Sequence, residues 1–470
     1  MRKHNRAYSK RGRTKCAQNR LARLRRVYNE QVNSNRAWIA RPYAIPEKPA
    51  VTIKIKKIKK SEVEAPSRKP ITVSTYEELR DTLASASTGS EIQLINDITV
   101  TSGLAIPANR SIYLTSDPNN NRRLTRGQLL GGDMVTVLEN AQLFLSRVTL
   151  DGNQYGVTVG SGALIAITHT NARVYLYSGS ELENNRNDFN SGGAVRIDGA
   201  GLAGLSIDGG VIRHNTVTQT DLYGGGVFVN KGVLELRDGE ITNNHASLGG
   251  GVAAFPSGYI QLVGDDMSIS ENTATDGGGV YLNGAAFAML AGDITRNNAD
   301  KNGGGMLMTG NSAFSMSGGA ISHNTALLDG GGIADENMVG GMDVNGALTN
   351  NTATRMGGAI YIAHDSLNRL RVGDSAVFAD NHAAWSTPAH TAADALLYNS
   401  FVSPSAVWTN PLSQGYNNYD ISYPKPSGGG GGSGGGGRFG GFGYSRTRRR
   451  ADQVVWCAST DFCECVRNHG

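Results

Sequence analysis

Aspartate is the residue type in this chain whose recurrence could support chemistry. Five aspartates lie near the same turn of successive segments: Asp208, Asp238, Asp265, Asp266 and Asp293. Paired carboxylates can act as acid and base in glycoside hydrolysis, and stacked carboxylates and amides offer the oxygen ligands that Ca²⁺ prefers. A catalytic pair is expected once in a chain, however, and aspartate is a common turn residue. We therefore predict corner residues, no catalytic residue and no cofactor, with structural calcium as the alternative.

Histidine and cysteine give two further signals. His214 and His323 each precede an asparagine at an equivalent place, where a general base is one interpretation and a turn residue is the other. Cys457, Cys463 and Cys465 lie near the C-terminus with a spacing that matches no common zinc pattern. We predict no metal site there, and we expect thiols that stay unpaired or crosslink chains.

A glycine repeat indicates which elements position these side chains. Between residues 192 and 360, two or three glycines followed by a small or branched apolar residue occur seven times, at intervals of 25 to 32 residues. A period in this range is typical of stacked-repeat architectures. Glycine at such points permits positive φ or a close approach of neighbouring coils. The repeat positions are Gly193, Gly226, Gly251, Gly279, Gly305, Gly332 and Gly358.

A second repeat places an asparagine three residues after an apolar residue, as in Ile212–Asn215. Asparagine at a repeated corner tolerates left-handed φ and can form a hydrogen-bonded ladder along a stack. The segment Asp293–Asn297 has an asparagine at the same offset, and we assign its repeat position to the adjacent Asn298. The predicted ladder positions are Asn215, Asn244, Asn272, Asn298, Asn324 and Asn351.

Each period contains about three short alternating segments that end in Gly, Asn or Asp. Such segments are typical of strands, whereas the glycine density and the lack of 3.6-residue apolar spacing disfavour helices. Short strands cannot bury a face alone, but stacked coils form parallel sheets around a narrow interior. We therefore predict an all-β fold, a right-handed parallel β-helix of about 10–12 coils, instead of a leucine-rich repeat or a propeller.

The tandem glycine and apolar-x-x-Asn units resemble the repeats of the chlamydial polymorphic outer-membrane proteins and of related bacterial adhesins with pectate-lyase-like β-helices. That family usually has Phe in the second unit, where this chain has Ile or Leu. The resemblance covers residues 70–385. It implies a pectate-lyase-like β-helix, a location at the cell surface or outside the cell, and an adhesin-like function.

Composition divides the chain into five regions. We predict a basic, disordered leader at residues 1–70, the β-helix at 71–385, an aromatic C-terminal cap at 386–423, a Pro/Gly linker at 424–437 and a basic, cysteine-containing tail at 438–470. A short cap helix should open the β-helix, because Thr75 and Glu78 have capping-box spacing and Leu79, Leu83 and Ala86 share one face. The aromatics of the C-terminal cap either pack on the last coil or form a carbohydrate-stacking surface.

Charge is distributed unevenly along the chain. Residues 1–60 contain 19 Lys and Arg against two acids, whereas residues 61–437 contain 20 basic and 35 acidic residues. An acidic solenoid does not attract nucleic acid, polyuronates or anionic membranes, so we predict no nucleic acid bound by the solenoid. No apolar run approaches the length of a transmembrane helix, and we recognise neither a signal peptide nor a wall anchor.

Two functions from different classes fit these features. The first is a non-catalytic, adhesin-like surface or secreted protein that binds a host or cell-surface protein or glycan, with specificity supplied by variable insertions such as residues 216–222 and 253–258. The second is a polysaccharide lyase or hydrolase on the same scaffold, which needs a groove where non-repeating charged residues converge. We expect the first function, in a monomer located at the cell surface or outside the cell.

Overall fold

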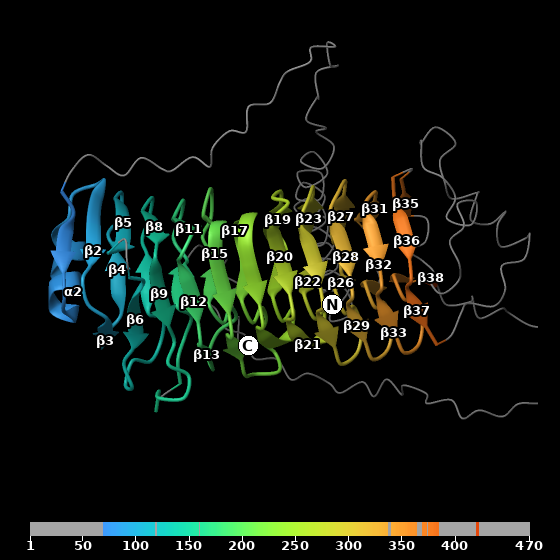
Figure 1. Cartoon of the computed structure of the whole chain (residues 1–470), viewed down its shortest axis with the longest axis horizontal. Helices are drawn as coiled ribbons and strands as arrows, with labels where there is room; N and C mark the ends of the chain where they lie inside the picture. Colours follow the sequence, from blue (N-terminus) through green and yellow to red (C-terminus); the bar gives the residue numbers. More distant parts are fainter. Residues whose placement is uncertain are drawn as a thin grey trace, which may run out of the picture. The chain divides into compact units, whose positions relative to one another are not determined.

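The computed structural model describes residues 69–117, 120–158, 160–336, 340–363, 369–373, 375–384 and 420–422. This part of the chain is a parallel β-solenoid of about ten turns that contains a single short helix (Figure 1). The predicted all-β parallel β-helix is therefore confirmed. Almost all of the predicted leader, most of the aromatic cap, and the whole linker and tail lie outside the described residues.

Each turn adds strands to stacked parallel sheets, which we number as faces 1 to 4 in the order in which the chain passes them after a glycine segment. The pairings between turns among the described strands are parallel, as in Val280 with Met306 and Ile294 with Ile321, with register shifts only in the pairings of β11 with β15, β15 with β17 and β17 with β19. Face 1 is formed by β4 (Leu104–Ile106), β7 (Val135–Val137), β10 (Ile165–Ile167), β14 (Val195–Ile197), the start of β17 (Val227–Thr242), the start of β19 (Val252–Leu262), β22 (Val280–Asn283), β26 (Met306–Thr309), β30 (Ile333–Glu336), β34 (Ile360–Ile362) and β38 (Ile421–Ser422).

Faces 2 and 3 continue the same turns. Face 2 is formed by β1 (Ile71–Val73), β2 (Ser90–Leu94), β5 (Ser111–Ser116), β8 (Gln142–Ser146), β11 (Arg173–Tyr177), the start of β15 (Gly204–Arg213), the middle of β17, the end of β19, β23 (Ala286–Met289), β27 (Ala313–Met316), β31 (Gly341–Val344) and β35 (Leu370–Val372). Face 3 is formed by β3 (Ile98–Val100), β6 (Arg122–Arg126), β9 (Val148–Asp151), β12 (Glu181–Glu183), the ends of β15 and β17, β20 (Met267–Ser270), β24 (Asp293–Thr295), β28 (Ala320–Ser322), β32 (Ala347–Thr349) and β36 (Val377–Ala379).

A fourth, narrow sheet was not among the three segments expected for each period. Its inward side is a column of buried alanines that includes Ala246, Ala274 and Ala299. A single methyl group per turn is too small to register as hydrophobic periodicity, which explains why the sequence pattern missed these strands. Face 4 is formed by β13 (Arg186–Asn187), β16 (Thr216–Val217), β18 (His245–Leu248), β21 (Thr273–Asp276), β25 (Asn298–Ala299), β29 (Thr325–Ala326), β33 (Thr352–Ala353) and β37 (His382–Ala383).

One continuous core fills the inside of the solenoid. Inward residues on faces 1 to 3 are mainly Ile, Val, Leu and Met, and most of them are fully buried. Stacking identical types on successive turns, as in Ile269, Ile294 and Ile321, lets each side chain pack on its equivalents above and below. Described residues 69–384 include no cysteine, so this packing and the backbone ladder stabilise the fold.

The predicted cap helix is α2 (Tyr76–Ser85), at the N-terminal end of the solenoid (Figure 1). Thr75 is its N-cap and accepts a hydrogen bond from the backbone N–H of Glu78. The Glu78 carboxylate accepts from the backbone N–H of Ser74, and this bond lowers the pKa of Glu78. Leu79 and Leu83 are buried in the core, so the helix covers the first turn.

Candidate functional site

The asparagine ladder runs along the corner between faces 3 and 4. In a representative turn, Asn297 Nδ2 donates to Asn324 Oδ1 in the next turn at 3.0 Å and to the carbonyl of Ile269 in the preceding turn at 2.9 Å. The Oδ1 of Asn297 accepts from the backbone N–H and from the Nδ2 of Asn272, both at 3.0 Å. The buried asparagines of this column are Asn185, Asn215, Asn244, Asn272, Asn297, Asn324, Asn351 and Asn381.

The assignment of Asn298 to this ladder is wrong, because Asn297 occupies the position. Asn298 instead begins β25 on face 4, in register with Thr273 and Thr325. Left-handed φ is also found one residue earlier than expected, at the residue before each ladder asparagine, for example 56° at Arg296. The left-handed residue turns the chain so that the following amide points into the corner.

The glycine segments form the corner between faces 4 and 1, and the glycines within one segment have different structural roles. The first glycine adopts positive φ, such as 67° at Gly303. The second and third glycines lie against the next turn: a Cβ on Gly304 would approach the carbonyl oxygen of Gly331 to 2.5 Å, and one on Gly305 would approach that of Gly332 to 2.6 Å. The second position is glycine in all seven segments, so steric exclusion is its role, whereas the third position is alanine at Ala194 and Ala359.

The predicted glycine set mixes two of these positions. The register of Val195 with Val227 places Gly193 opposite Gly225 and places Ala194 opposite Gly226. Gly193 and Gly358 are thus second glycines, while Gly226, Gly251, Gly279, Gly305 and Gly332 are third glycines.

The recurring aspartates follow the corner between faces 2 and 3. Asp208 and Asp238 are in register, and Asp265 and Asp266 lie in the turn that precedes β20. Asp293 departs from the expectation of one shared turn, because it begins β24 opposite Ser268. Partial burial raises the pKa of the Asp293 carboxyl.

The two histidines considered as general bases occupy turn positions. His214 and His323 are exposed, and their φ angles of 55° and 56° make them the left-handed residues that precede ladder asparagines. Among the residues that the structure describes, no three His, Cys, Asp or Glu side chains gather closely enough to hold a metal ion.

Non-repeating charged side chains do converge on the outer side of face 3. Arg123 Nη1 lies 2.6 Å from both Asp151 Oδ2 and Glu183 Oε1, and Arg213 Nη2 lies 2.7 Å from Glu181 and 2.8 Å from Glu183. Each guanidinium thus bridges carboxylates, and each carboxylate accepts charge-assisted hydrogen bonds. This arrangement crosslinks adjacent turns and offers no separate proton donor and base.

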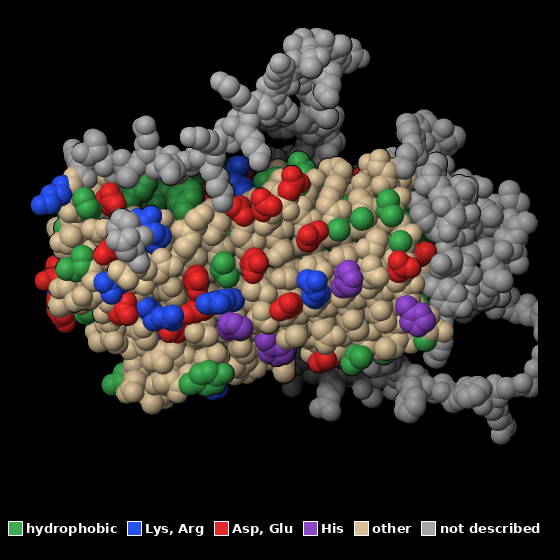
Figure 2. Space-filling model, viewed as in Figure 1, with side chains coloured by type: hydrophobic (Ala, Val, Ile, Leu, Met, Phe, Trp, Pro, Cys, Tyr) green, Lys and Arg blue, Asp and Glu red, His purple; other side chains and the backbone are tan. Residues whose placement is uncertain are grey.

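A different group of apolar side chains is exposed in the loops that lead into face 1, from face 3 in two turns and from β13 of face 4 in the third. Leu129, Tyr155 and Phe189 are 79%, 95% and 62% exposed, and we call these three residues the corner patch. They lie in the loops of three successive turns. Figure 2 shows apolar side chains along the lower left edge of the described part of the solenoid. Soluble proteins rarely leave large apolar side chains exposed together without a binding role.

The loops that carry the corner patch are tied to one another by backbone hydrogen bonds. The N–H of Thr158 donates to the carbonyl of Gln128 at 3.0 Å, and the N–H of Asp188 donates to the carbonyl of Ser161 at 3.0 Å. The first bond joins the loop of Leu129 to that of Tyr155, and the second joins the loop of Tyr155 to that of Phe189. The exposed side chains therefore project from three loops that are hydrogen-bonded to one another.

Local residues also fix where the two aromatic rings project. Asn153 has φ of 52°, and its carbonyl accepts the N–H groups of Gly156 and Val157, which closes a tight turn around Tyr155. The Oδ1 of the buried Asn187 accepts a hydrogen bond from the backbone N–H of Phe189 at 3.2 Å. This bond fixes the start of the loop that carries Phe189. A Cβ at Gly160 would lie 2.4 Å from the ring of Phe189, so the ring lies directly over this glycine.

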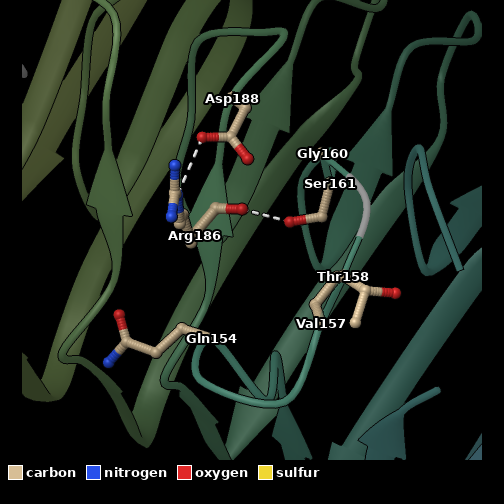
Figure 3. Close-up of a pocket in the computed structure, with 7 residues that line it drawn as sticks. All are labelled: Gln154, Val157, Thr158, Gly160, Ser161, Arg186 and Asp188. Atoms are coloured by element: carbon tan, nitrogen blue, oxygen red, sulfur yellow. Dashed lines mark hydrogen bonds and ion pairs between the residues drawn. The ribbon is translucent and has the colours of Figure 1, made fainter. Parts of the chain in front are cut away.

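A polar pocket of about 160 Å³ lies beside the corner patch (Figure 3). Arg186 Nε pairs with Asp188 Oδ1 at 2.9 Å, and the Ser161 hydroxyl donates to the carbonyl of Arg186. Thr218 in the next turn donates to the same oxygen of Asp188 at 2.8 Å. The one carboxylate that lines the pocket, that of Asp188, is already paired with Arg186. The pocket therefore suits recognition of a polar group. The lining residues are Gln154, Val157, Thr158, Gly160, Ser161, Arg186 and Asp188.

The insertions that the sequence singled out have different structures. Residues 216–222 do include an exposed stretch after β16, whereas residues 253–258 lie within the long strand β19. Sequence reasoning missed Leu129, Tyr155 and Phe189, because the early turns lack the glycine triplets that mark each corner. The signal that could have found them is an apolar residue isolated among turn formers, as in Asn153–Gly156.

The fold and these sites define the chain as a β-solenoid protein with a polar and aromatic surface at one corner. No protein family, curated protein or solved structure matches the chain. None of the helices among the described residues could span a lipid bilayer.

Proposed function

We propose that this chain is a non-catalytic, adhesin-like β-solenoid, displayed at the cell surface or secreted, that binds a protein or glycan of another surface through the corner patch. The observation that carries the proposal is the exposure of Leu129, Tyr155 and Phe189 on three loops that are hydrogen-bonded to one another. Exposed aromatic side chains on preorganised loops gain binding energy at a small cost in conformational entropy.

The polar pocket supports the same proposal. It lies next to the apolar side chains and offers the guanidinium of Arg186 and the carboxylate of Asp188. Binding sites commonly combine an apolar centre with a few polar groups that set orientation.

The bonding of the charged cluster on face 3 favours binding over hydrolysis. Its carboxylates are shared between Arg123 and Arg213, whereas a glycosidase requires one carboxyl group that donates a proton and a second that acts separately. A catalytic site would also be expected to place a nucleophile that is not engaged in an ion pair beside a general base.

The experiment compares binding of the purified, fluorescently labelled chain to intact cells from a panel of eukaryotic and bacterial lines. The test variant replaces the corner patch (Leu129→Ser, Tyr155→Ser, Phe189→Ser). The matched control replaces three exposed apolar residues elsewhere on the solenoid (Leu202→Ser, Leu290→Ser, Leu327→Ser). We expect saturable binding that falls at least tenfold in the test variant and stays unchanged in the control.

Two results would contradict the proposed function. One is equal binding by the test and control variants, because the corner patch would then be irrelevant. The other is catalytic turnover, seen as new reducing ends or unsaturated products released from a polysaccharide panel, because it would establish the enzyme alternative.

A further inference from the structure

The polar pocket beside the corner patch contains an ion pair that leaves hydrogen-bonding groups unused. Arg186 Nε lies 2.9 Å from Asp188 Oδ1, and the hydroxyl of Thr218 donates to the same oxygen at 2.8 Å. Among the described residues, neither Asp188 Oδ2 nor the two terminal nitrogens of Arg186 have a hydrogen-bond partner (Figure 3). The pocket therefore offers guanidinium donors next to a carboxylate acceptor.

Contacts from three successive turns hold this ion pair in place. The backbone N–H of Asp188 donates to the carbonyl of Ser161 at 3.0 Å, and the Ser161 hydroxyl donates to the carbonyl of Arg186. Thr218 fixes Asp188 from the following turn. The Asp188 side chain is only 18% exposed, whereas that of Arg186 is 58% exposed. The acceptor is thus positioned before a ligand binds, which lowers the entropic cost of binding.

The lining of the pocket indicates the charge and size of a suitable ligand. Arg186 and Asp188 are its two charged members, and their charges cancel, so a neutral ligand fits without an uncompensated charge. The volume of about 160 Å³ equals that of roughly five water molecules at about 30 Å³ each. This space accommodates one small ring, so the terminal unit of a longer ligand is the part that enters.

Adjacent hydroxyl groups of a sugar match the unused groups of the ion pair. Each hydroxyl both donates and accepts, so one accepts from the Arg186 guanidinium while its neighbour donates to Asp188 Oδ2. A peptide group is a poorer match, because the N–H and C=O of a planar trans peptide point in opposite directions. The geometry of the pair therefore favours a sugar over a peptide backbone.

An exposed aromatic ring borders the same pocket. Gly160 lines the pocket, and a Cβ on this residue would lie 2.4 Å from the ring of Phe189, so the ring contacts the pocket wall. Phe189 is nevertheless 62% exposed, which leaves it accessible to a ligand. The apolar C–H face of a sugar can pack on such a ring while the hydroxyls at the edge of the sugar form hydrogen bonds.

We propose that the polar pocket binds the terminal, neutral monosaccharide unit of a glycan. Arg186 and Asp188 bind two adjacent hydroxyls, and Phe189 contacts the apolar face of the sugar. The inference rests on the proposed function, because it names the class of ligand that the same surface binds.

Saturation-transfer difference NMR with the full chain tests the inference, because it detects weak binding of small ligands. The probes are the methyl glycosides of glucose, galactose, mannose, fucose and N-acetylglucosamine. The methyl glycoside of galacturonic acid is the anionic counterpart, and N-acetylglutamine methylamide is a carboxamide that also pairs a donor with an acceptor. We expect saturable binding of at least one neutral glycoside, with a dissociation constant at least tenfold lower than those of the anionic and carboxamide probes.

Two substitutions and a matched control locate the binding. Arg186→Met removes the donors and should weaken binding at least tenfold, and Asp188→Asn should weaken it at least fivefold by removing a charge-assisted acceptor. Arg237→Met is the control, because Arg237 also pairs with an acid two residues away, Glu235, and its side chain is 51% exposed. The control should leave glycoside binding unchanged. Circular dichroism verifies that each variant is folded.

The inference is overturned if no neutral glycoside binds, if the anionic or carboxamide probe binds as tightly, or if Arg186→Met and Asp188→Asn both bind like the parent chain. Its failure is distinguishable from failure of the proposed function, because the cell-binding test replaces the corner patch and keeps the ion pair. Cell binding that depends on the corner patch, without binding of any glycoside, would refute this inference and leave the proposed function standing.

Discussion

At the scale of single residues, the ladder asparagines show how a short motif specifies a corner. Each one has a buried amide with donors and an acceptor, and at Asn297 all of these groups are bonded to neighbouring turns. A buried amide left without partners costs more than a hydrogen bond contributes. The correct stacking of turns therefore depends on an asparagine at one position in each turn.

The first prediction compares two adjacent asparagines. Asn297→Ala removes the acceptor of Asn272 and the donor to Ile269, so we expect a loss of roughly 3 kcal/mol in the free energy of unfolding. Asn298→Ala, at a half-buried place on face 4, should change it by no more than about 0.5 kcal/mol. Denaturant unfolding followed by circular dichroism measures both. Equal losses would contradict the assignment of the ladder to Asn297.

The second prediction concerns the pH dependence of stability. Partial burial is the largest cause that raises the pKa of Glu336 above its ordinary value of 4.5, and the charges of Asp276 and Asp329 raise it further. The folded state therefore holds this proton more tightly than the unfolded state, so stability rises as the pH falls from neutrality through the raised pKa toward 4.5. Above the raised pKa, that contribution is absent.

Glu336→Gln removes the titrating group. We expect the variant to be more stable than the parent chain at pH 7, and we expect the difference to shrink as the pH approaches the ordinary value. Thermal unfolding midpoints across this range measure the effect. A difference that does not change with pH would show that the Glu336 carboxyl has the same proton affinity in both states.

The residue scale also shows the limits of the sequence pattern. The offset of three residues from an apolar residue identifies Asn215, Asn244, Asn272, Asn324 and Asn351, all of which are buried. Where two asparagines are adjacent, the offset from Ile294 selects Asn297 over Asn298. Composition cannot distinguish the two, because each is an asparagine at a turn.

At the scale of elements, the glycine corner explains why the repeat contains glycine. The first glycine needs positive φ, whereas the second needs space, because its Cα faces carbonyl oxygens of the next turn. The glycine repeat alone does not show which glycine needs positive φ and which needs space. The sequence therefore predicts both requirements without assigning either to a position. The third position tolerates alanine at Ala194 and Ala359, in the first and last of the seven segments.

The third prediction separates steric exclusion from backbone conformation. A Cβ at Gly278 would lie 2.5 Å from the carbonyl oxygens of both Asn298 and Gly304, so Gly278→Ala should cost about 3 kcal/mol or more. Gly89 has φ of 80° but no atom within 4 Å of an added Cβ, so Gly89→Ala should cost only about 1–2 kcal/mol. Unfolding free energies of the two variants decide the matter, and a smaller loss at Gly278 would contradict the steric account.

Strand prediction worked where alternation was strong. Runs such as Phe287–Leu290 and Val233–Leu236 predict the strands of face 2, and the capping residues Thr75 and Glu78 predict α2. Face 4 escaped prediction because its inward residues are single alanines. The corner loops escaped it because an exposed Tyr or Phe has the same sequence signature as a buried one.

At the scale of the whole molecule, the proposed function rests on differences between the outer surfaces of the solenoid. On parts of the exterior, similar polar side chains repeat at equivalent positions of successive turns. An example is the outward column of face 4 that contains Thr273, Thr325 and Thr352. The corner patch breaks this regularity with exposed apolar groups, two of them aromatic. A stacked-repeat core leaves such outer positions free to vary, which makes the scaffold suited to display binding surfaces.

The central claim of a displayed binding protein is tested most directly by immunolabelling of intact, unpermeabilised cells of the producing organism. The antibody is raised against purified solenoid, residues 71–385, and a cytosolic enzyme serves as the internal marker. We predict labelling of intact cells that external protease abolishes while the cytosolic marker stays protected, or recovery of the solenoid from the medium. A signal that appears only after permeabilisation, with none in the medium, would contradict the account.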